Sequence, residues 1–149
     1  MPASVTFEDK DKGMQRVIDE INTQGGFVDT GVQSDEDGEL LIIAAANEFG
    51  TKNIPARPYI RGAIDSNEAE IQELAVRYSG EILDGTTSRF EALTFMGQFI
   101  EGMIKRHMVN LREPPNAPST IKKKGSDNPL IDKSNLIGSI RYAVKEGEA

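Results

Sequence analysis

Residues 59–111 decide the fold, and they read YIRGAIDSNEAEIQELAVRYSGEILDGTTSRFEALTFMGQFIEGMIKRHMVNL. Apolar side chains recur in this stretch at the three- and four-residue spacing of a helix, in two separate runs. The first run covers residues 59–84, and its stripe consists of Ile60, Ala63, Ile64, Ile71, Leu74, Ala75, Tyr78 and Ile82. The stripe of the second run consists of Phe90, Leu93, Gly97, Ile100, Ile104, His107, Met108 and Leu111. The stretch therefore predicts two long helices.

The connection between these two predicted helices is short. Asp84-Gly85 ends the first helix, and Thr87 or Ser88 caps the second. Glu91 follows Ser88 by three residues, which is the spacing of a capping box. Because so few residues join the helices, we expect them to run antiparallel beside each other as a helical hairpin.

Two short segments, one on each side of the hairpin, have the alternating pattern of β-strands. In Phe27–Gln33 alternate residues share one face, and Ile140–Val144 alternates in the same way. We expect these two segments to form a small sheet on which the hairpin packs. The predicted fold class is therefore α+β, in a single domain that spans residues 1–149.

Three shorter helices are predicted around this frame. Residues 9–23 carry an apolar helical stripe that stops at Gly25–Gly26. Leu40–Phe49 is an apolar run that suits either a buried strand or a short buried helix, and its alanines and Glu48 favour the helix. Leu130–Ile140 favours a third helix.

Residues 112–133 form a predicted irregular arm. Three prolines lie near its start, residues 119–124 suffice for one helical turn, and Asn128-Pro129 interrupts the segment. The lysines at 122–124 are either a solvated run or a contact with an acidic partner or with DNA in a channel. A segment of this composition is suited to order on a neighbouring subunit.

Composition limits the class of protein. The 149 residues are 38% apolar, which suggests a thin shape that buries its remaining apolar surface against neighbouring subunits. The net charge of −7 argues against sequence-independent binding to duplex DNA. Met1–Lys10 lacks the apolar segment of a signal peptide, and the longest apolar run, Leu40–Ala46, is too short to span a bilayer. We therefore expect a soluble protein made in a cytoplasm, with no membrane partner.

The sequence contains no recognisable catalytic, cofactor or metal site. Cysteine is absent, so there is neither a disulfide nor a thiolate ligand. His107 is the one histidine, and it falls on an apolar helical stripe without a second ligand or a catalytic partner in the sequence. No phosphate-binding glycine loop and no nucleophile motif occurs. We therefore expect a protein that is not an enzyme and that holds no cofactor.

One stretch carries a family resemblance. It is Ile43-Ala44-Ala45-Ala46-Asn47-Glu48-Phe49-Gly50-Thr51, followed by Asn53-Ile54-Pro55-Ala56-Arg57-Pro58-Tyr59-Ile60-Arg61. It resembles the Ile-Ala-x-x-x-Glu-Phe-Gly … Ile-Pro-Ala-Arg-Pro-Phe-Leu-Arg signature of the neck and tail-completion proteins of tailed phages, including the minor tail protein Z-like and virion-morphogenesis groups. Pro129-Leu130-Ile131-Asp132-Lys133-Ser134-Asn135-Leu136 with Ser139-Ile140 resembles a second motif of the same group, except that Lys133-Ser134 replaces Thr-Gly. The resemblance covers roughly residues 40–144.

The resemblance implies a structural protein of the virion at the head–tail junction, as a subunit of a neck or tail-terminator ring. It implies a homo-oligomeric ring, sixfold in symmetry, that surrounds the DNA channel and contacts other neck, connector and tail proteins. Glu48 beside Arg57 and Arg61 offers charge-assisted pairs, which either lock the loop within one subunit or bridge neighbours. The predicted interface residues are Glu48, Arg57, Tyr59, Arg61, Lys122, Lys123, Lys124 and Asp132. The alternative is a small prophage-encoded regulatory or adaptor module without catalytic activity.

Overall fold

A computed structural model describes residues 18–19, 25–33, 38–125, 127–130 and 135–146 of the chain. The predicted α+β fold class is confirmed. The elements, in chain order, are β1 (Gly26–Val32), α2 (Gly38–Phe49), α3 (Tyr59–Ser66), α4 (Glu68–Asp84), α5 (Arg89–Asn110), α6 (Pro118–Lys124), α7 (Asn135–Ser139) and β2 (Ile140–Glu146). Ile18 and Asp19 are helical, and the rest of the predicted helix 9–23 lies outside the described residues.

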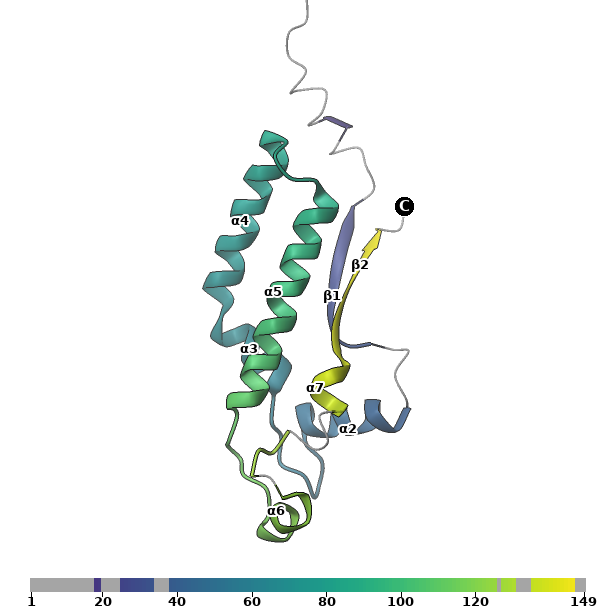
Figure 1. The fold of residues 1–149 in the computed structure, drawn as a ribbon, viewed down its shortest axis with the longest axis vertical. Helices are drawn as coiled ribbons and strands as arrows, with labels where there is room; N and C mark the ends of the chain where they lie inside the picture. Colours follow the sequence, from purple (N-terminus) through teal and green to yellow (C-terminus); the bar gives the residue numbers. More distant parts are fainter. Residues whose placement is uncertain (1–17, 20–24, 34–37, 126, 131–134, 147–149) are drawn as a thin grey trace, which may run out of the picture.

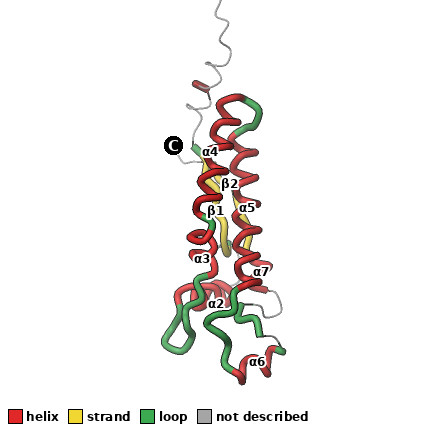
Figure 2. The backbone as a smooth tube through the Cα atoms, turned by 90° about the vertical axis from the view of Figure 1, so that its left-hand side faces the viewer, coloured by secondary structure: helices red, strands yellow, loops and turns green. Residues whose placement is uncertain are grey.

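The molecule is elongated, and α5 is its central element. α4, α5 and both strands run along the long axis, whereas α2 lies across the lower end and α6 lies at the lower tip (Figure 1). α5 packs against α3, α4 and both strands. Seen from the side, the strands lie behind the helices as a second layer (Figure 2). The chain is thus built from a helical layer and a two-stranded sheet that meet along α5.

The predicted helical hairpin is confirmed. Gly85 ends α4 with a φ of 74°, a left-handed conformation that glycine adopts without strain, and its N–H donates to the Glu81 and Ile82 carbonyls. Ser88 then caps α5, and both bonds of the predicted capping box with Glu91 are present. The backbone and side-chain hydrogen bonds from Ser88 lower the pKa of the Glu91 carboxyl.

The prediction of one continuous helix over residues 59–84 is wrong at Asn67, where the chain divides into α3 and α4. The Asn67 side-chain amide donates to the Ala63 carbonyl at 2.8 Å, and its backbone N–H donates to the Ile64 carbonyl at 3.1 Å. An asparagine that bonds locally to the backbone in this way competes with the regular helical ladder. The apolar periodicity continues across the break and therefore gives no sign of it.

The sheet is the predicted pair of segments, one from each side of the hairpin. β1 and β2 are antiparallel, with Thr30 opposite Tyr142. The face that carries Tyr142 lies on α5 at Gly97, where an added Cβ atom would stand 2.5 Å from Tyr142 Cδ2 and 2.8 Å from Val28 Cγ2. Gly97 therefore permits the close approach of sheet and helix.

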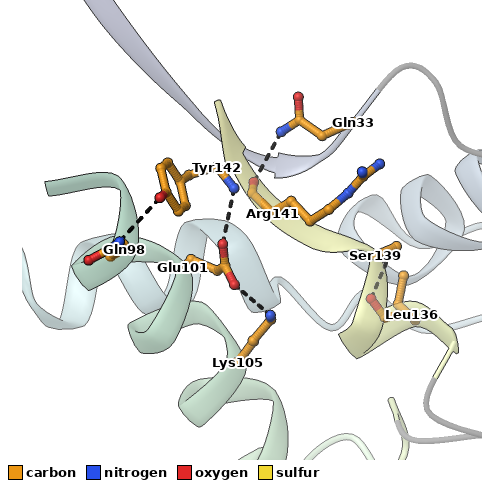
Figure 3. A network of polar contacts seen from close by, with 8 residues as sticks. All are labelled: Gln33, Gln98, Glu101, Lys105, Leu136, Ser139, Arg141 and Tyr142. Atoms are coloured by element: carbon orange, nitrogen blue, oxygen red, sulfur yellow. Dashed lines mark hydrogen bonds and ion pairs between the residues drawn. The ribbon is translucent and has the colours of Figure 1, made fainter. Parts of the chain in front are cut away.

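Polar contacts fix β2 along α5 (Figure 3). The Glu101 carboxylate accepts a hydrogen bond from the Tyr142 backbone N–H at 3.1 Å and pairs with Lys105 Nζ at 2.6 Å. Gln98 Nε2 donates to the Tyr142 hydroxyl at 3.2 Å. Glu101 thus gives a partner to a backbone N–H of β2 and joins this strand to α5.

The core lies at the lower end of the molecule, where α2, α3, α7 and the second half of α5 meet. Its buried members are Ala44, Tyr59, Ala63, Ile104, Met108, Leu130, Leu136 and Ile140. By contrast, α4 has no buried residue. Large apolar side chains stay exposed on several helices, among them Ile42 and Phe49 at 72% and Val76 at 74%. The described part of the chain thus leaves large apolar side chains uncovered on α2, α4 and α5.

Gly97→Ala should lower the free energy of unfolding by roughly 1–3 kcal/mol, because the new methyl group overpacks the sheet against α5. The matched control is Gly102→Ala on the same helix, where nothing lies within 4 Å of the added Cβ. That control should be neutral, or more stable by about 0.5–1 kcal/mol, since alanine is the better helix former. Urea denaturation measures both, and equal stability of the two variants would contradict this packing.

Candidate functional site

The Glu48 carboxylate caps the N-terminus of α3. It is buried on α2, and its two oxygens accept from the backbone N–H groups of Ile60 at 2.9 Å and Arg61 at 3.1 Å. Such first-turn N–H groups have no partner inside their own helix, and the positive end of the helix dipole favours an anion. Pro58, at the cap position, makes no side-chain cap bond. Glu48 therefore takes over the capping role and joins α2 to α3.

Within the described part of the chain, Glu48 does not pair with the guanidinium groups of Arg57 and Arg61, so the predicted ion pairs inside one subunit are wrong there. Glu48 bonds to the backbone N–H of Arg61 instead of its side chain. The alternative, in which the pairs bridge neighbouring subunits, stays a prediction. The Arg61 side chain itself is exposed. The Glu48 carboxylate thus obtains its hydrogen-bond donors from the backbone at the start of α3, and it does not need the arginine side chain.

Arg57 connects the motif to the segment after α5. Its side chain is buried, with the residue only 4% exposed. Nε donates to the Pro114 carbonyl at 2.8 Å, and Nη2 donates to the Pro115 carbonyl at 3.0 Å and to Asn116 Oδ1 at 3.3 Å. All three acceptors are neutral. Burial lowers the pKa of Arg57, because desolvation disfavours the charged form.

The tight fold of the loop before Arg57 fixes the position of this residue. Gly50 ends α2 with a φ of 76°, and an added Cβ there would lie 2.8 Å from the backbone nitrogen of Ala56. The Arg57 backbone N–H donates to the Asn47 carbonyl at 2.6 Å. Glycine at position 50 is required on both counts, since it supplies the left-handed turn and leaves room for the returning chain.

Tyr59 is almost completely buried in the core, and its hydroxyl donates to the Ala44 carbonyl at 3.4 Å. Burial, and secondarily the negative charge of Glu48, raise the pKa of Tyr59 above its usual range. Glu48, Arg57 and Tyr59 are thus brought together by α2, the loop and the start of α3. Their described contacts lie within the chain, and a role in an interface stays a prediction for them.

The remaining predicted interface residues lie apart from this group. Lys122 and Lys123 are exposed on α6. Lys124 is half-buried, and its ammonium donates to the carbonyls of Asn128 at 3.3 Å and Pro129 at 3.5 Å. Asp132 lies outside the described residues. Of the lysine run, Lys124 alone turns toward the motif.

The predicted arm folds back onto its own chain over the part that is described. Arg57 holds residues 114–116, α6 follows, and Leu130 is buried in the core. Leu130, inside the predicted arm, is thus a core residue of its own chain. Residues 131–133 of the predicted arm lie outside the described residues.

Two asparagines in this segment matter and were not singled out from the sequence. Asn128 is buried, and its amide nitrogen donates to the Val109 carbonyl at 3.0 Å, at the end of α5, while its oxygen accepts from Leu130 N–H at 3.0 Å. Asn116 accepts from Arg57. In a sequence, an asparagine beside a proline predicts an ordinary turn. Only the burial of the side chain, which the structure shows, indicates a structural role.

A pocket of about 610 Å³ lies beside this junction. Its walls come from α2, the loop at residues 53–57, the segment at 115–124, Leu130 and the start of α7. Arg57 and Lys124 line it, and none of the described residues that line it is acidic. The described lining is therefore cationic in a chain whose net charge is −7.

His107 does not belong to this site. The imidazole packs over α3, where a Cβ added at Gly62 would stand 3.0 Å from Nε2. Within the described ranges, no group of three metal-ligating side chains comes together. No helix in the described part of the chain has the length and apolar character needed to cross a membrane.

Arg57→Leu should lower the free energy of unfolding by about 2–4 kcal/mol, because the carbonyls at 114 and 115 lose a charged donor in a partly buried place. Arg61→Leu is the matched control, with an exposed side chain in the same motif, and should change stability by no more than about 0.5 kcal/mol. Urea titration of the two variants decides, and equal losses would refute the structural role of Arg57.

Because of the raised pKa of Tyr59, we expect the free energy of unfolding to fall at alkaline pH. An unfolded tyrosine has a pKa near 10, and the folded chain raises the pKa of Tyr59 above that value. Above about pH 10 the unfolded state therefore binds fewer protons, and stability falls as pH rises. Tyr59→Phe removes this component, so its unfolding free energy should fall less steeply between roughly pH 9 and 11. Identical slopes in the two proteins would contradict the burial of the hydroxyl.

Comparisons with known proteins add no relative to this description. No family model, no curated protein and no solved structure matches the chain. Two features of the chain therefore bear on its function. They are the geometry around Glu48 and Arg57 and the resemblance carried by residues 43–61.

Proposed function

We propose that the chain is a structural subunit of the head–tail junction of a tailed-phage virion, in a neck or tail-completion ring, and that it is not an enzyme. The observation that carries the proposal is the place of the resembling stretch in the fold. Glu48, Arg57 and Tyr59 of that stretch are buried and join α2, α3 and the segment after α5. A signature whose residues hold one subunit in shape suits a family defined by its architecture and assembly.

The uncovered apolar surface supports assembly with neighbours. Ile42 and Phe49 project from α2, while Val76 on α4 and Phe90 on α5 are exposed on the hairpin. A neighbouring subunit that covered these side chains would remove their apolar surface from water and thereby stabilise the assembly. Because these residues lie on different elements, one subunit offers two different surfaces. Contact between unlike surfaces generates a ring when the rotation closes.

In such a ring, contact with DNA would not depend on sequence. Contacts with DNA phosphates require clustered cations, and the chain is acidic overall, so such contacts would be limited to its few clustered lysines. Lys122 and Lys123 are exposed on α6 and are the proposed DNA-facing charges if the ring surrounds the channel. Other neck, connector and tail proteins are the proposed neighbours above and below the ring.

The test is self-association of the purified full chain, followed by native mass spectrometry and negative-stain electron microscopy. We expect closed rings, sixfold in symmetry. The double variant Ile42→Ser, Phe49→Ser should weaken association by about tenfold or more, since each exposed apolar side chain loses its burial in the interface. Val109→Ser, another exposed apolar position, is the control and should leave association unchanged.

Purified virions give the independent check. The proposal expects the chain in the particle at a fixed ring stoichiometry, and it expects heads and tails that fail to join when the gene is deleted. A chain that is absent from virions and stays monomeric at every concentration would contradict the proposal and favour an adaptor module.

A further inference from the structure

The floor of the pocket has more hydrogen-bond donors than acceptors. A guanidinium carries five N–H groups, and those on Nε and Nη2 of Arg57 account for its three described bonds. The hydrogen bonds of Arg57 within the described ranges include none from Nη1. The Asn116 amide nitrogen is buried and has no acceptor there. Lys124 has three N–H donors and makes only two long bonds, of 3.3 and 3.5 Å.

The charge of the pocket is not balanced from within. Arg57 and Lys124 are its ionisable lining residues, and neither pairs with a carboxylate in the described part of the chain. A buried cation without an anion is unfavourable unless its environment compensates, and neutral carbonyls compensate only in part. A carboxylate at this point would form short, charge-assisted bonds.

The walls of the pocket are suited to the rest of an amino-acid side chain. Leu40, Ile43, Ile54 and Leu136 line it, and Ile43 and Ile54 stay partly exposed. These residues offer apolar contact to the aliphatic stem of a glutamate and to an apolar neighbour beside it. A phosphate or an inorganic anion would satisfy the donors but would leave these walls without a contact.

We infer, on the basis of the proposed ring, that this pocket is a carboxylate-binding site and that in the assembly an acidic side chain of a second copy of the chain fills it. Arg57 and Lys124 bind the carboxylate, and the apolar walls hold its stem. The pocket is thus one half of a contact between unlike surfaces.

The second copy offers the complementary half. Four exposed acids lie between residues 65 and 73, and we call them the acidic patch; its members are Asp65, Glu68, Glu70 and Glu73. None pairs with a cation within the described ranges, although Glu68 accepts a bond from Gln72. The patch lies on α3 and α4, whereas the walls of the pocket come from α2, α6, the loops beside them and the start of α7. Complementary charges on two different surfaces of one chain fit head-to-tail contact.

A charge swap on the full chain tests this inference by sedimentation velocity. Lys124→Glu should weaken self-association by about tenfold, because the carboxylate is then repelled. The pair Glu70→Lys, Glu73→Lys should weaken it similarly. All three changes in one chain again place opposite charges at position 124 and at positions 70 and 73, and association should recover to within about threefold of wild type. Arg106→Glu, an exposed charge reversal on α5, is the control and should leave association unchanged.

Circular dichroism and thermal unfolding first establish that each variant is folded. Wild-type rings whose dissociation constant is unchanged by Lys124→Glu would overturn the pocket assignment and leave the ring proposal intact. A triple variant as weak as the single changes combined would overturn the assignment to the acidic patch. A wild-type chain that stays monomeric would contradict the ring proposal and, with it, this inference.

Discussion

A buried guanidinium has to find acceptors for its N–H groups, and the acceptors of Arg57 decide where the chain goes after α5. The carbonyls of residues 114 and 115 come to Arg57, and Asn128 then holds the returning chain against the end of α5. Leu130 enters the core as a result. Without these bonds a segment with four prolines and three lysines would have little apolar surface to offset the entropy of its ordering.

The sequence predicted the elements that depend on local chemistry. The helical hairpin, the capping box at Ser88 and the pairing of two terminal segments all follow from periodicity and from turn residues. The break at Asn67 and the partners of Glu48 and Arg57 did not follow. Backbone amides and carbonyls leave no signature in a sequence, and the acceptors of Arg57 lie 57–59 positions further along the chain. A cluster of motif residues was foreseeable, but its hydrogen-bond partners were not.

The distribution of packing over the molecule bears on its role. The lower end holds the core and the polar junction, whereas α4 has no buried residue and packs mainly against α5. The buried apolar residues of this chain are concentrated at the lower end of the molecule, and few of them lie in the upper half of the hairpin. Burial of that remaining surface by neighbouring subunits would stabilise each subunit by mass action. In the proposed ring, the stability of each folded subunit would therefore depend on its association with neighbours.

Native-state hydrogen exchange, read by mass spectrometry on the full chain, tests the central claim most directly. If Arg57 and Asn128 join the segment after α5 to the core, then the amides of α6 and of Leu130 should open in one cooperative unit with the second half of α5. The account predicts comparable opening free energies for these amides. Exchange of α6 and Leu130 at the rate of an unstructured peptide, while α5 stays protected, would contradict it.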